Sequence, residues 1–206
     1  MATEPASIAL EQVSKRYGRQ WVIRGLDATF SGKAVYGIRG RNGSGKSTLL
    51  RMLAGQLSPS RGSVRFSLGG TAVKPEAMYR HVSWTGPYFE IVEELSVREM
   101  LTFHFRMKPA RNGLTPAAML ERTELGPYAD RALHDCSSGM RQRVLLATAL
   151  YAATPVLLLD EPTVTFDAPA TAWFHGELAT FGADRLVIIA SNDPADLRTC
   201  ATLVDL

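Results

Sequence analysis

The chain has 206 residues, of which 46% are hydrophobic, and it carries a formal charge of +3. This length and apolar content are enough to bury a substantial core, which excludes an intrinsically disordered chain and fits one large domain or one domain with a lobe. Lysine and arginine are scattered among the acids without a block of like charge, so no nucleic-acid partner is expected.

The compartment is indicated by cysteines and by apolar runs. Cys136 and Cys200 are isolated, which argues against a metal site or a disulfide framework and fits a reduced cytosol. Residues 1–5 lack the basic start and apolar run of a signal peptide. The longest apolar stretch, 144–159, is shorter than a membrane span and contains Pro155. We therefore expect neither a signal peptide nor a transmembrane segment.

The first 30 residues predict a small antiparallel sheet. Ile8, Leu10 and Val13 indicate a first strand, and residues 14–18 are interpreted as a turn into 21–23. The apolar side chains of residues 26–30 alternate with polar ones, which is typical of a half-buried strand.

Residues 40–48, GRNGSGKST, match the pattern G-x-x-x-x-G-K-[ST] between an apolar run and a helix. Glycines let the backbone approach phosphates, and N–H groups at a helix N-terminus bind anions. Lys46 is predicted to reach the β and γ phosphates, Ser47 to bind Mg²⁺, and Thr48 to support the turn or contact the α phosphate. The alternative is a plain glycine-rich turn capped by Ser44. The other predicted phosphate-binding residues are Gly40, Asn42, Gly43, Ser44 and Gly45.

The middle of the chain changes from strands to helices. The loop helix is predicted to end near Gly55, and strands are predicted around 64–66 and 81–84. Ser96 to Glu99 forms a capping box, and Thr115-Pro116 opens a second helix. Residues from about 87 to 136 therefore predict a mostly helical insertion.

The last third alternates helices and strands. Helices are predicted at 139–152 and 167–181, with strands at 156–159 and 186–189. Asp160 and Glu161 follow a strand that is apolar throughout, which is typical of the carboxyl end of a buried parallel strand. The predicted fold class is α/β, with a mostly parallel sheet, an N-terminal antiparallel β-subdomain and the inserted helical subdomain. Residues 1–206 are predicted to form a single domain.

Two further motifs give the chain a family resemblance. Residues 137–143, SSGMRQR, precede 156–163, VLLLDEPT, by one short helix and a loop. Together with the phosphate loop, Tyr17 and Asp167, they resemble the ATP-binding cassette family, the ATPase subunits of ABC transporters. The resemblance covers nearly the whole chain in the family's order, and it implies a P-loop NTPase core that uses ATP and Mg²⁺.

The resemblance implies roles for individual residues. Tyr17 would stack on adenine, although a simple turn tyrosine is the alternative. Asp160 would hold Mg²⁺ through water, and Glu161 would be the general base that activates the attacking water; adjacent acids that cap the next helix are the alternative. Ser138 and Gly139 would face the γ phosphate held by a second cassette. Asp167 would couple the two sites or serve as a helix N-cap, and both interpretations stay open.

Two positions depart from the family pattern. Pro87 stands where a glutamine usually contacts Mg²⁺, so either this link is lost or Glu90 replaces it. Asn192 stands at the catalytic switch histidine; asparagine can donate a hydrogen bond but carries no charge, so slower turnover is predicted. His175 is expected to be an ordinary surface residue rather than a replacement.

The implied function is that of a transporter ATPase at the cytoplasmic face of the membrane. Its partners would be membrane-spanning permease subunits and a second cassette, identical or different, with the helical insertion as docking surface. The compact length resembles stand-alone bacterial cassettes, including heme-exporter types. One alternative is a degenerate cassette that binds ATP with little hydrolysis, and another is a soluble ABC ATPase acting on DNA or ribosomes. The sequence does not identify the cargo or the direction of transport.

Overall fold

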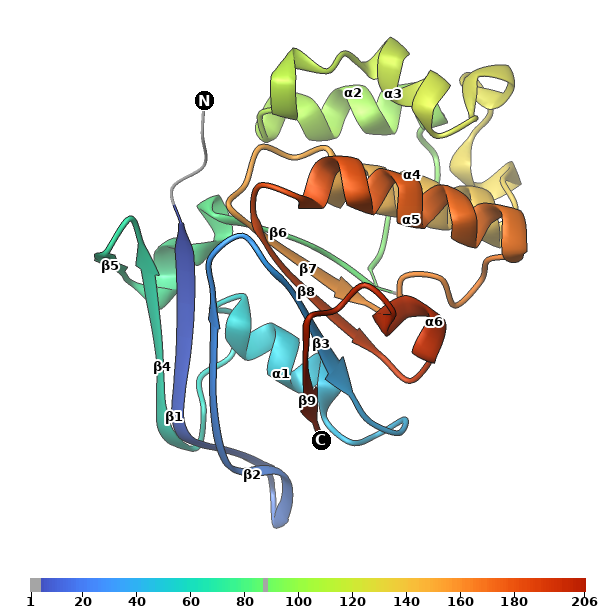
Figure 1. Cartoon of the computed structure of the whole chain (residues 1–206). Coiled ribbons are helices and arrows are strands. Elements are labelled where there is room, and N and C mark those ends of the chain that lie inside the picture. The colour runs from blue at the N-terminus through green and yellow to red at the C-terminus, as the bar shows by residue number, and fades with distance from the viewer. Residues whose placement is uncertain (1–4, 87–88) are drawn as a thin grey trace. The chain divides into compact units, whose positions relative to one another are not determined.

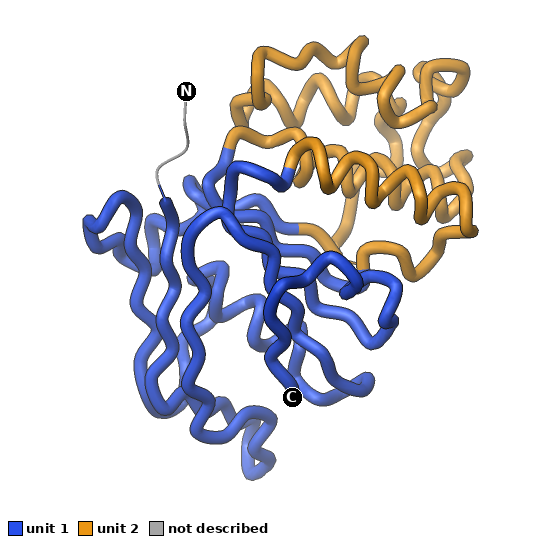
Figure 2. Tube along the Cα trace, in the orientation of Figure 1, with its two compact units in different colours: residues 1–84, 154–161, 182–206 blue, residues 85–153, 162–181 orange. Residues whose placement is uncertain are grey.

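The computed structural model describes residues 5–86 and 89–206, so Pro87 lies outside the described residues. Contacts divide the chain into two compact units (Figure 2). Unit 1 holds residues 1–84, 154–161 and 182–206, and unit 2 holds residues 85–153 and 162–181. Unit 2 thus takes in the segment 89–136 together with two later stretches. The single-domain interpretation with an insertion at about 87–136 stays a prediction.

Unit 1 begins with an antiparallel sheet in the order β2-β1-β4-β5 (Figure 1). Its strands are β1 (Ala6–Tyr17), β2 (Gln20–Ser31), β4 (Arg61–Leu68) and β5 (Thr71–Val73). The predicted turn over 14–18 is wrong, because β1 continues to Tyr17 and the chain turns only at residues 18–19. Bulges explain the error: Gln12 has a φ of 49°, and the β1–β2 register shifts three times between Leu10 and Arg16, which interrupts the alternation.

The second sheet of unit 1 has the order β6-β7-β8-β3-β9. Its strands are β3 (Val35–Arg39), β6 (Val82–Thr85), β7 (Val156–Asp160), β8 (Leu186–Ser191) and β9 (Thr202–Asp205), and the pairs β7–β8, β8–β3 and β3–β9 are parallel. Every residue of β7 and β8 is buried, which confirms the strands predicted from the two apolar runs. Sequence reasoning missed β9, whose residues are mostly exposed because it is an edge strand.

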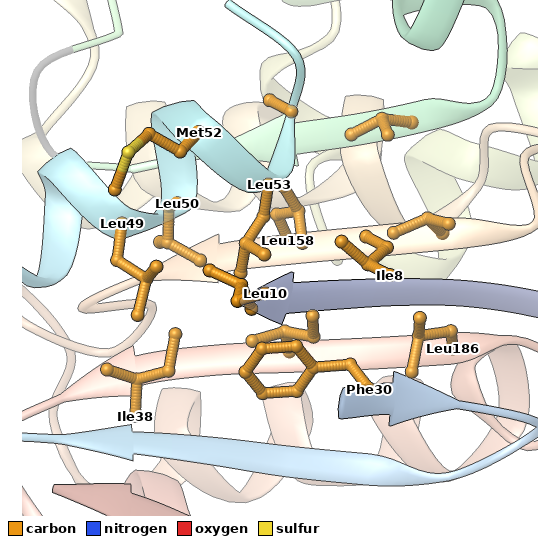
Figure 3. Packing of buried hydrophobic residues seen from close by; sticks show 14 of the residues in the cluster. Ile8, Leu10, Phe30, Ile38, Leu49, Leu50, Met52, Leu53, Leu158 and Leu186 are labelled. Carbon is orange, nitrogen blue, oxygen red and sulfur yellow. The ribbon is translucent and has the colours of Figure 1, made fainter. Parts of the chain in front are cut away.

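The core of unit 1 includes the phosphate-loop helix α1 (Lys46–Leu53). Figure 3 shows Leu49, Leu50 and Leu53 of this helix among side chains from several strands, such as Phe30 and Leu158, and all five are fully buried. Burying side chains of this size stabilises a fold by about 1.5–3 kcal/mol each. The helix that follows the phosphate loop is therefore held firmly by its apolar face.

Unit 2 is mostly helical. Its helices are α2 (Val97–Met107), α3 (Pro116–Arg122), α4 (Ser138–Leu150) and α5 (Ala168–Gly182, of which Gly182 belongs to unit 1), with short 3-10 turns between them. The capping box of Ser96 and Glu99 is present, and Thr115 caps α3, as predicted. The predicted α/β fold class with an antiparallel and a parallel sheet is confirmed.

A partly buried polar cluster joins three helices of unit 2. Glu177 of α5 accepts hydrogen bonds from Nε and Nη2 of Arg122 and from the hydroxyl of Tyr151, at 2.7–3.0 Å. His175, two residues earlier on α5, is only 7% exposed, so the expectation of a surface histidine is wrong. The apolar periodicity of the segment does not reveal which polar side chains pack inward. None of the helices in the described ranges is long and apolar enough to cross a membrane.

Candidate functional site

The phosphate loop of unit 1 leaves the N-terminus of α1 open. Gly43 and Gly45 have φ angles of 81° and 107°, a region that favours glycine. Gly45 is the N-cap residue, and no side chain makes a capping hydrogen bond, so the alternative of a turn capped by Ser44 is wrong. The first N–H groups of α1 are therefore left for a bound anion.

Close packing explains two of the loop glycines. A Cβ on Gly40 would collide with the Ser44 hydroxyl and lie 2.8 Å from the carbonyl oxygen of Leu206. A Cβ on Gly45 would lie 2.7 Å from Cγ1 of Val22 on β2. Contacts under 3.0 Å force a shift in the surroundings, so the loop keeps its shape only with glycine at both positions.

Lys46 points back along the loop and meets an acid. Its Nζ donates to the carbonyl oxygen of Gly40 at 2.9 Å and lies 3.0 Å from Oε1 of Glu161. The two side chains are only 6% and 16% exposed. A buried pair of this kind is retained only where the two charges compensate each other, so Lys46 and Glu161 form one electrostatic unit.

Asp160 and Ser47 offer oxygen atoms suited to a hard cation. Asp160, at the end of β7, is 4% exposed, and its Oδ1 has no hydrogen-bond partner among the described residues. Burial raises the pKa of this carboxyl, and a hydrogen bond from Ser47 opposes the shift. An orphaned carboxylate oxygen beside a hydroxyl fits Mg²⁺, which binds few protein ligands and completes its shell with water and phosphate. No group of three or more His, Cys, Asp or Glu side chains suited to a metal occurs in the described part of the chain.

Glu161 stands at a sharp change of backbone direction. Its N–H still donates to the carbonyl oxygen of Ala190 as a sheet residue would, but its φ is 44°. Non-glycine residues in this region are uncommon and cluster at functional sites. Its carboxylate accepts hydrogen bonds from the hydroxyl of Ser191 at 2.8 Å and from the N–H of Asn192 at 3.2 Å. The carboxylate of Glu161 is thus held from two sides, by Lys46 and by the end of β8.

Asn192 contacts the phosphate loop. Its Nδ2 donates to Oδ1 of Asn42 at 3.1 Å, which joins the residue after β8 to a predicted phosphate-binding residue.

Tyr17 lies at the end of β1, where its side chain is 49% exposed and Nζ of Lys15 lies 5.6 Å from the ring centroid. The ring is thus accessible for stacking, and the adenine-binding role of Tyr17 stays a prediction.

The signature residues are in unit 2. The hydroxyl of Ser137 caps α4 by accepting a hydrogen bond from the N–H of Met140. Ser138 and Gly139 lie between these two residues and form the first positions of the helix. Asp167 accepts from the N–H of Ala170 at 2.9 Å, so it does cap the start of α5; its coupling role across a dimer stays a prediction. Ser138, Gly139 and Asp167 line a common cavity of about 460 Å³.

Glu90, the suggested replacement for the missing glutamine, also lies in unit 2. It lines a second cavity of about 420 Å³ together with Ser138 and Arg141. Its role toward Mg²⁺ stays a prediction. Sequence reasoning assigned no role to Ser191, although its position between a buried strand and the switch residue is a usable signal.

Known proteins place these motifs in context. The model of the family described as ABC transporter matches residues 23–164. The chain is 35% identical over 171 residues to the daunorubicin/doxorubicin resistance ATP-binding protein DrrA of Streptomyces peucetius, covering 81% of this chain and 52% of that protein. It thus spans about half the length of that relative. It is 30% identical over 202 residues to the cytochrome c biogenesis ATP-binding export protein CcmA of Paraburkholderia xenovorans (strain LB400), covering 89% of each.

Solved structures share the fold. The ATP-binding cassette MJ0796, in a dimeric post-hydrolysis state bound to ADP and Pi, superposes with a TM-score of 0.82. The identity is 19%, and the match covers 97% of this chain and 94% of that one. At this identity the likeness establishes the arrangement of the backbone and no more.

Proposed function

The chain belongs to the ABC transporter family, and we propose that it is the subunit that binds and hydrolyses ATP to power substrate movement. The family match confirms the resemblance that the motifs indicate. The proposal goes one step further and assigns a role within the family. The observation that carries the proposal is the cluster at one edge of the parallel sheet in unit 1. This edge carries the open phosphate loop with Lys46 and the two acids Asp160 and Glu161.

ATP binding would use the loop first. The uncapped N–H groups of α1 and the ammonium of Lys46 would hold the phosphates, and Tyr17 would stack on adenine. Lys46 is engaged with Glu161 in this structure, so the arrival of phosphate would open that ion pair and release one carboxylate oxygen. Ser47 and Asp160 would hold Mg²⁺, which neutralises the charge that develops on the phosphate oxygens.

Hydrolysis would use Glu161 as general base. Its carboxylate would take a proton from water while the water oxygen bonds to the γ phosphorus and the bond to the β,γ-bridging oxygen breaks. The products are ADP and inorganic phosphate. Proton transfer of this kind contributes about 10²–10⁴ in rate, so Glu161 is the residue on which turnover should depend most.

The partners are proposed from the relatives. MJ0796 forms a dimer in its solved structure, which supports a second cassette for this chain, with the Ser138 segment of one copy facing the nucleotide of the other. DrrA and CcmA are named as resistance and export ATP-binding proteins, which supports membrane-spanning permease subunits and a place at the cytoplasmic face of the membrane. Their named roles differ, so no cargo is assigned to this chain.

The test is steady-state Mg-ATP turnover over a range of protein concentrations, with Glu161→Gln beside the wild type. We expect turnover per chain to rise with protein concentration, and to fall at least about 100-fold in Glu161→Gln while ATP still binds. Glu121→Gln, which changes an exposed acid on α3, is the matched control and should leave turnover unchanged. Full turnover in Glu161→Gln would refute the assigned base.

A second candidate is a cassette that binds ATP as a switch without appreciable hydrolysis. The observation that favours it is Asn192, whose neutral side chain is hydrogen-bonded to Asn42 of the phosphate loop. ATP-driven dimerisation of the wild type with no release of phosphate, also in the presence of a permease partner, would select this candidate over the first.

A further inference from the structure

The hydroxyl of Ser191 lies between two carboxylates. Its Oγ is 2.8 Å from Oε2 of Glu161 and 2.7 Å from Oδ2 of Asp196, and it accepts the N–H of Asp193 at 3.0 Å. Ser191 is 0% exposed and Asp196 is 1% exposed. Because a hydroxyl has a single proton, it can donate to only one of the two carboxylates at a time.

The two oxygens of the Glu161 carboxylate have different principal partners. Oε1 is paired with Nζ of Lys46 at 3.0 Å, whereas Oε2 faces the Ser191 hydroxyl. The N–H of Asn192 lies at a similar distance from both, 3.2 and 3.3 Å, and so favours neither. Lys46 and Ser191 therefore grip the carboxylate from opposite sides, one from the phosphate loop and one from strand β8.

We propose that Ser191 is a positioning residue for Glu161, and that the buried carboxylate of Asp196 competes with Glu161 for the Ser191 proton. This inference rests on the proposed function, since it gives Glu161 the role of general base. When Lys46 turns to a phosphate, Oε1 is released to receive the proton of water. Ser191 keeps Oε2 in place, so the carboxylate does not rotate away from the position in which Oε1 can accept that proton.

The grip of Ser191 on Glu161 does not depend on the side chain at position 192. The carboxylate is oriented by a hydroxyl and a backbone N–H that both belong to the end of β8. Neither contact requires a charged side chain at the switch position. Rigid support of a reacting group by a second layer of hydrogen bonds is a general requirement for precise geometry.

The first test compares Ser191→Ala with Ser83→Ala. Ser83 is also a buried, hydrogen-bonded serine in the same sheet, at 3% exposure, but its hydroxyl contacts Thr154 and Val156. We expect Ser191→Ala to lower kcat about 10- to 100-fold, with the Kd for ATP measured without Mg²⁺ unchanged within about threefold. Ser83→Ala should keep the wild-type kcat. Equal kcat values for Ser191→Ala and wild type would overturn the inference and leave the proposed function standing.

The second test asks whether Asp196 competes. In Asp196→Asn the new amide can donate to Oγ of Ser191, so the single hydroxyl proton is committed to Glu161. We expect kcat at or above the wild-type value in a variant that melts within a few degrees of wild type. A fall in kcat as large as that of Ser191→Ala, in folded protein, would overturn the competition.

The third readout does not depend on turnover. Crystal structures of wild type and Ser191→Ala with a non-hydrolysable ATP analogue, in which Lys46 would turn to phosphate, would show the carboxylate of Glu161 directly. A rotated or disordered carboxylate in the variant is the expected result. An unmoved carboxylate would overturn the inference. If wild type hydrolyses no ATP even with a permease partner present, the proposed function fails, and these two structures still decide whether Ser191 positions Glu161.

Discussion

Helices α1 and α2 begin in opposite ways. The N-terminus of α1 follows a left-handed glycine, Gly45, and has no side-chain cap. The N-terminus of α2 is closed by a capping box, in which Ser96 accepts from the N–H of Glu99 and the Glu99 carboxylate accepts from the N–H of Ser96. One helix leaves its first donors for a ligand, and the other satisfies them within the chain.

The difference shows where local stability is given up for function. A side-chain cap is typically worth about 1 kcal/mol, which α2 gains and α1 does without. Helix α1 is held instead by its buried leucines, so its open end does not unravel the helix. Helix α4 is intermediate: Ser137 caps it through Met140, and the preceding N–H groups belong to the signature residues Ser138 and Gly139.

The largest effect on the open end of α1 is expected from a substitution at Gly45. Gly45→Ala puts a side chain at a φ of 107° and a Cβ 2.7 Å from Val22, so we expect unfolding to become easier by about 3 kcal/mol and ATP affinity to be lost. Chemical denaturation and nucleotide titration measure the two effects. Gly43→Ala is the control, because its φ of 81° is strained but nothing lies within 4 Å of the added Cβ, and about half the destabilisation is expected. Equal effects of the two substitutions would show that close packing against β2 contributes nothing.

A pair of serine substitutions tests the caps themselves. Ser96→Ala removes the cap of α2 and should lower the free energy of unfolding by about 1 kcal/mol. Ser44→Ala should leave it unchanged in nucleotide-free protein, because Ser44 makes no capping hydrogen bond. Urea denaturation of both variants beside wild type measures the difference. A comparable loss in Ser44→Ala would mean that α1 has a cap after all.

The smallest expected effect is a pH dependence of the α2 cap. Hydrogen bonds from the backbone N–H and the hydroxyl of Ser96 lower the pKa of Glu99. The folded state therefore favours the ionised carboxylate, so the contribution is present above the ordinary pKa of glutamate and is lost as pH falls through the lowered value. We expect the stability difference between wild type and Glu99→Gln to shrink as pH falls below about 4. A difference that stays constant down to pH 2 would contradict this origin.

Sequence reasoning succeeded where the pattern is local and strong. The strands at 156–159 and 186–189 are buried on both faces, so an unbroken apolar run identifies them. The capping residues Ser96 and Thr115 also act through neighbours three residues away, which makes them visible in the sequence. The phosphate loop is found for the same reason, since its glycines serve the backbone geometry of the loop itself.

It failed where long-range contacts decide. The length of β1 depends on bulges that a period of two does not represent, and β9 is specified by pairing with β3 rather than by its own residues. The burial of His175 is set by how α5 packs and not by polarity. The Lys46–Glu161 pair joins residues more than a hundred positions apart, and so do the contacts that Asn192 makes with the phosphate loop, so neither can be read along the chain.

Because the backbone turns at Glu161, the two neighbouring acids make different contacts, and a mutation can change one without the other. Asp160 is directed to the Ser47 hydroxyl, while Glu161, one codon later, is directed to Lys46 and Ser191. Each acid can thus be replaced without removing the contacts of the other. A single nucleotide change at codon 161 would remove the proposed proton acceptor while strand β7, the phosphate loop and the proposed cation ligands persist. On the proposed function, a cassette that only binds ATP would be one mutation away from one that hydrolyses it.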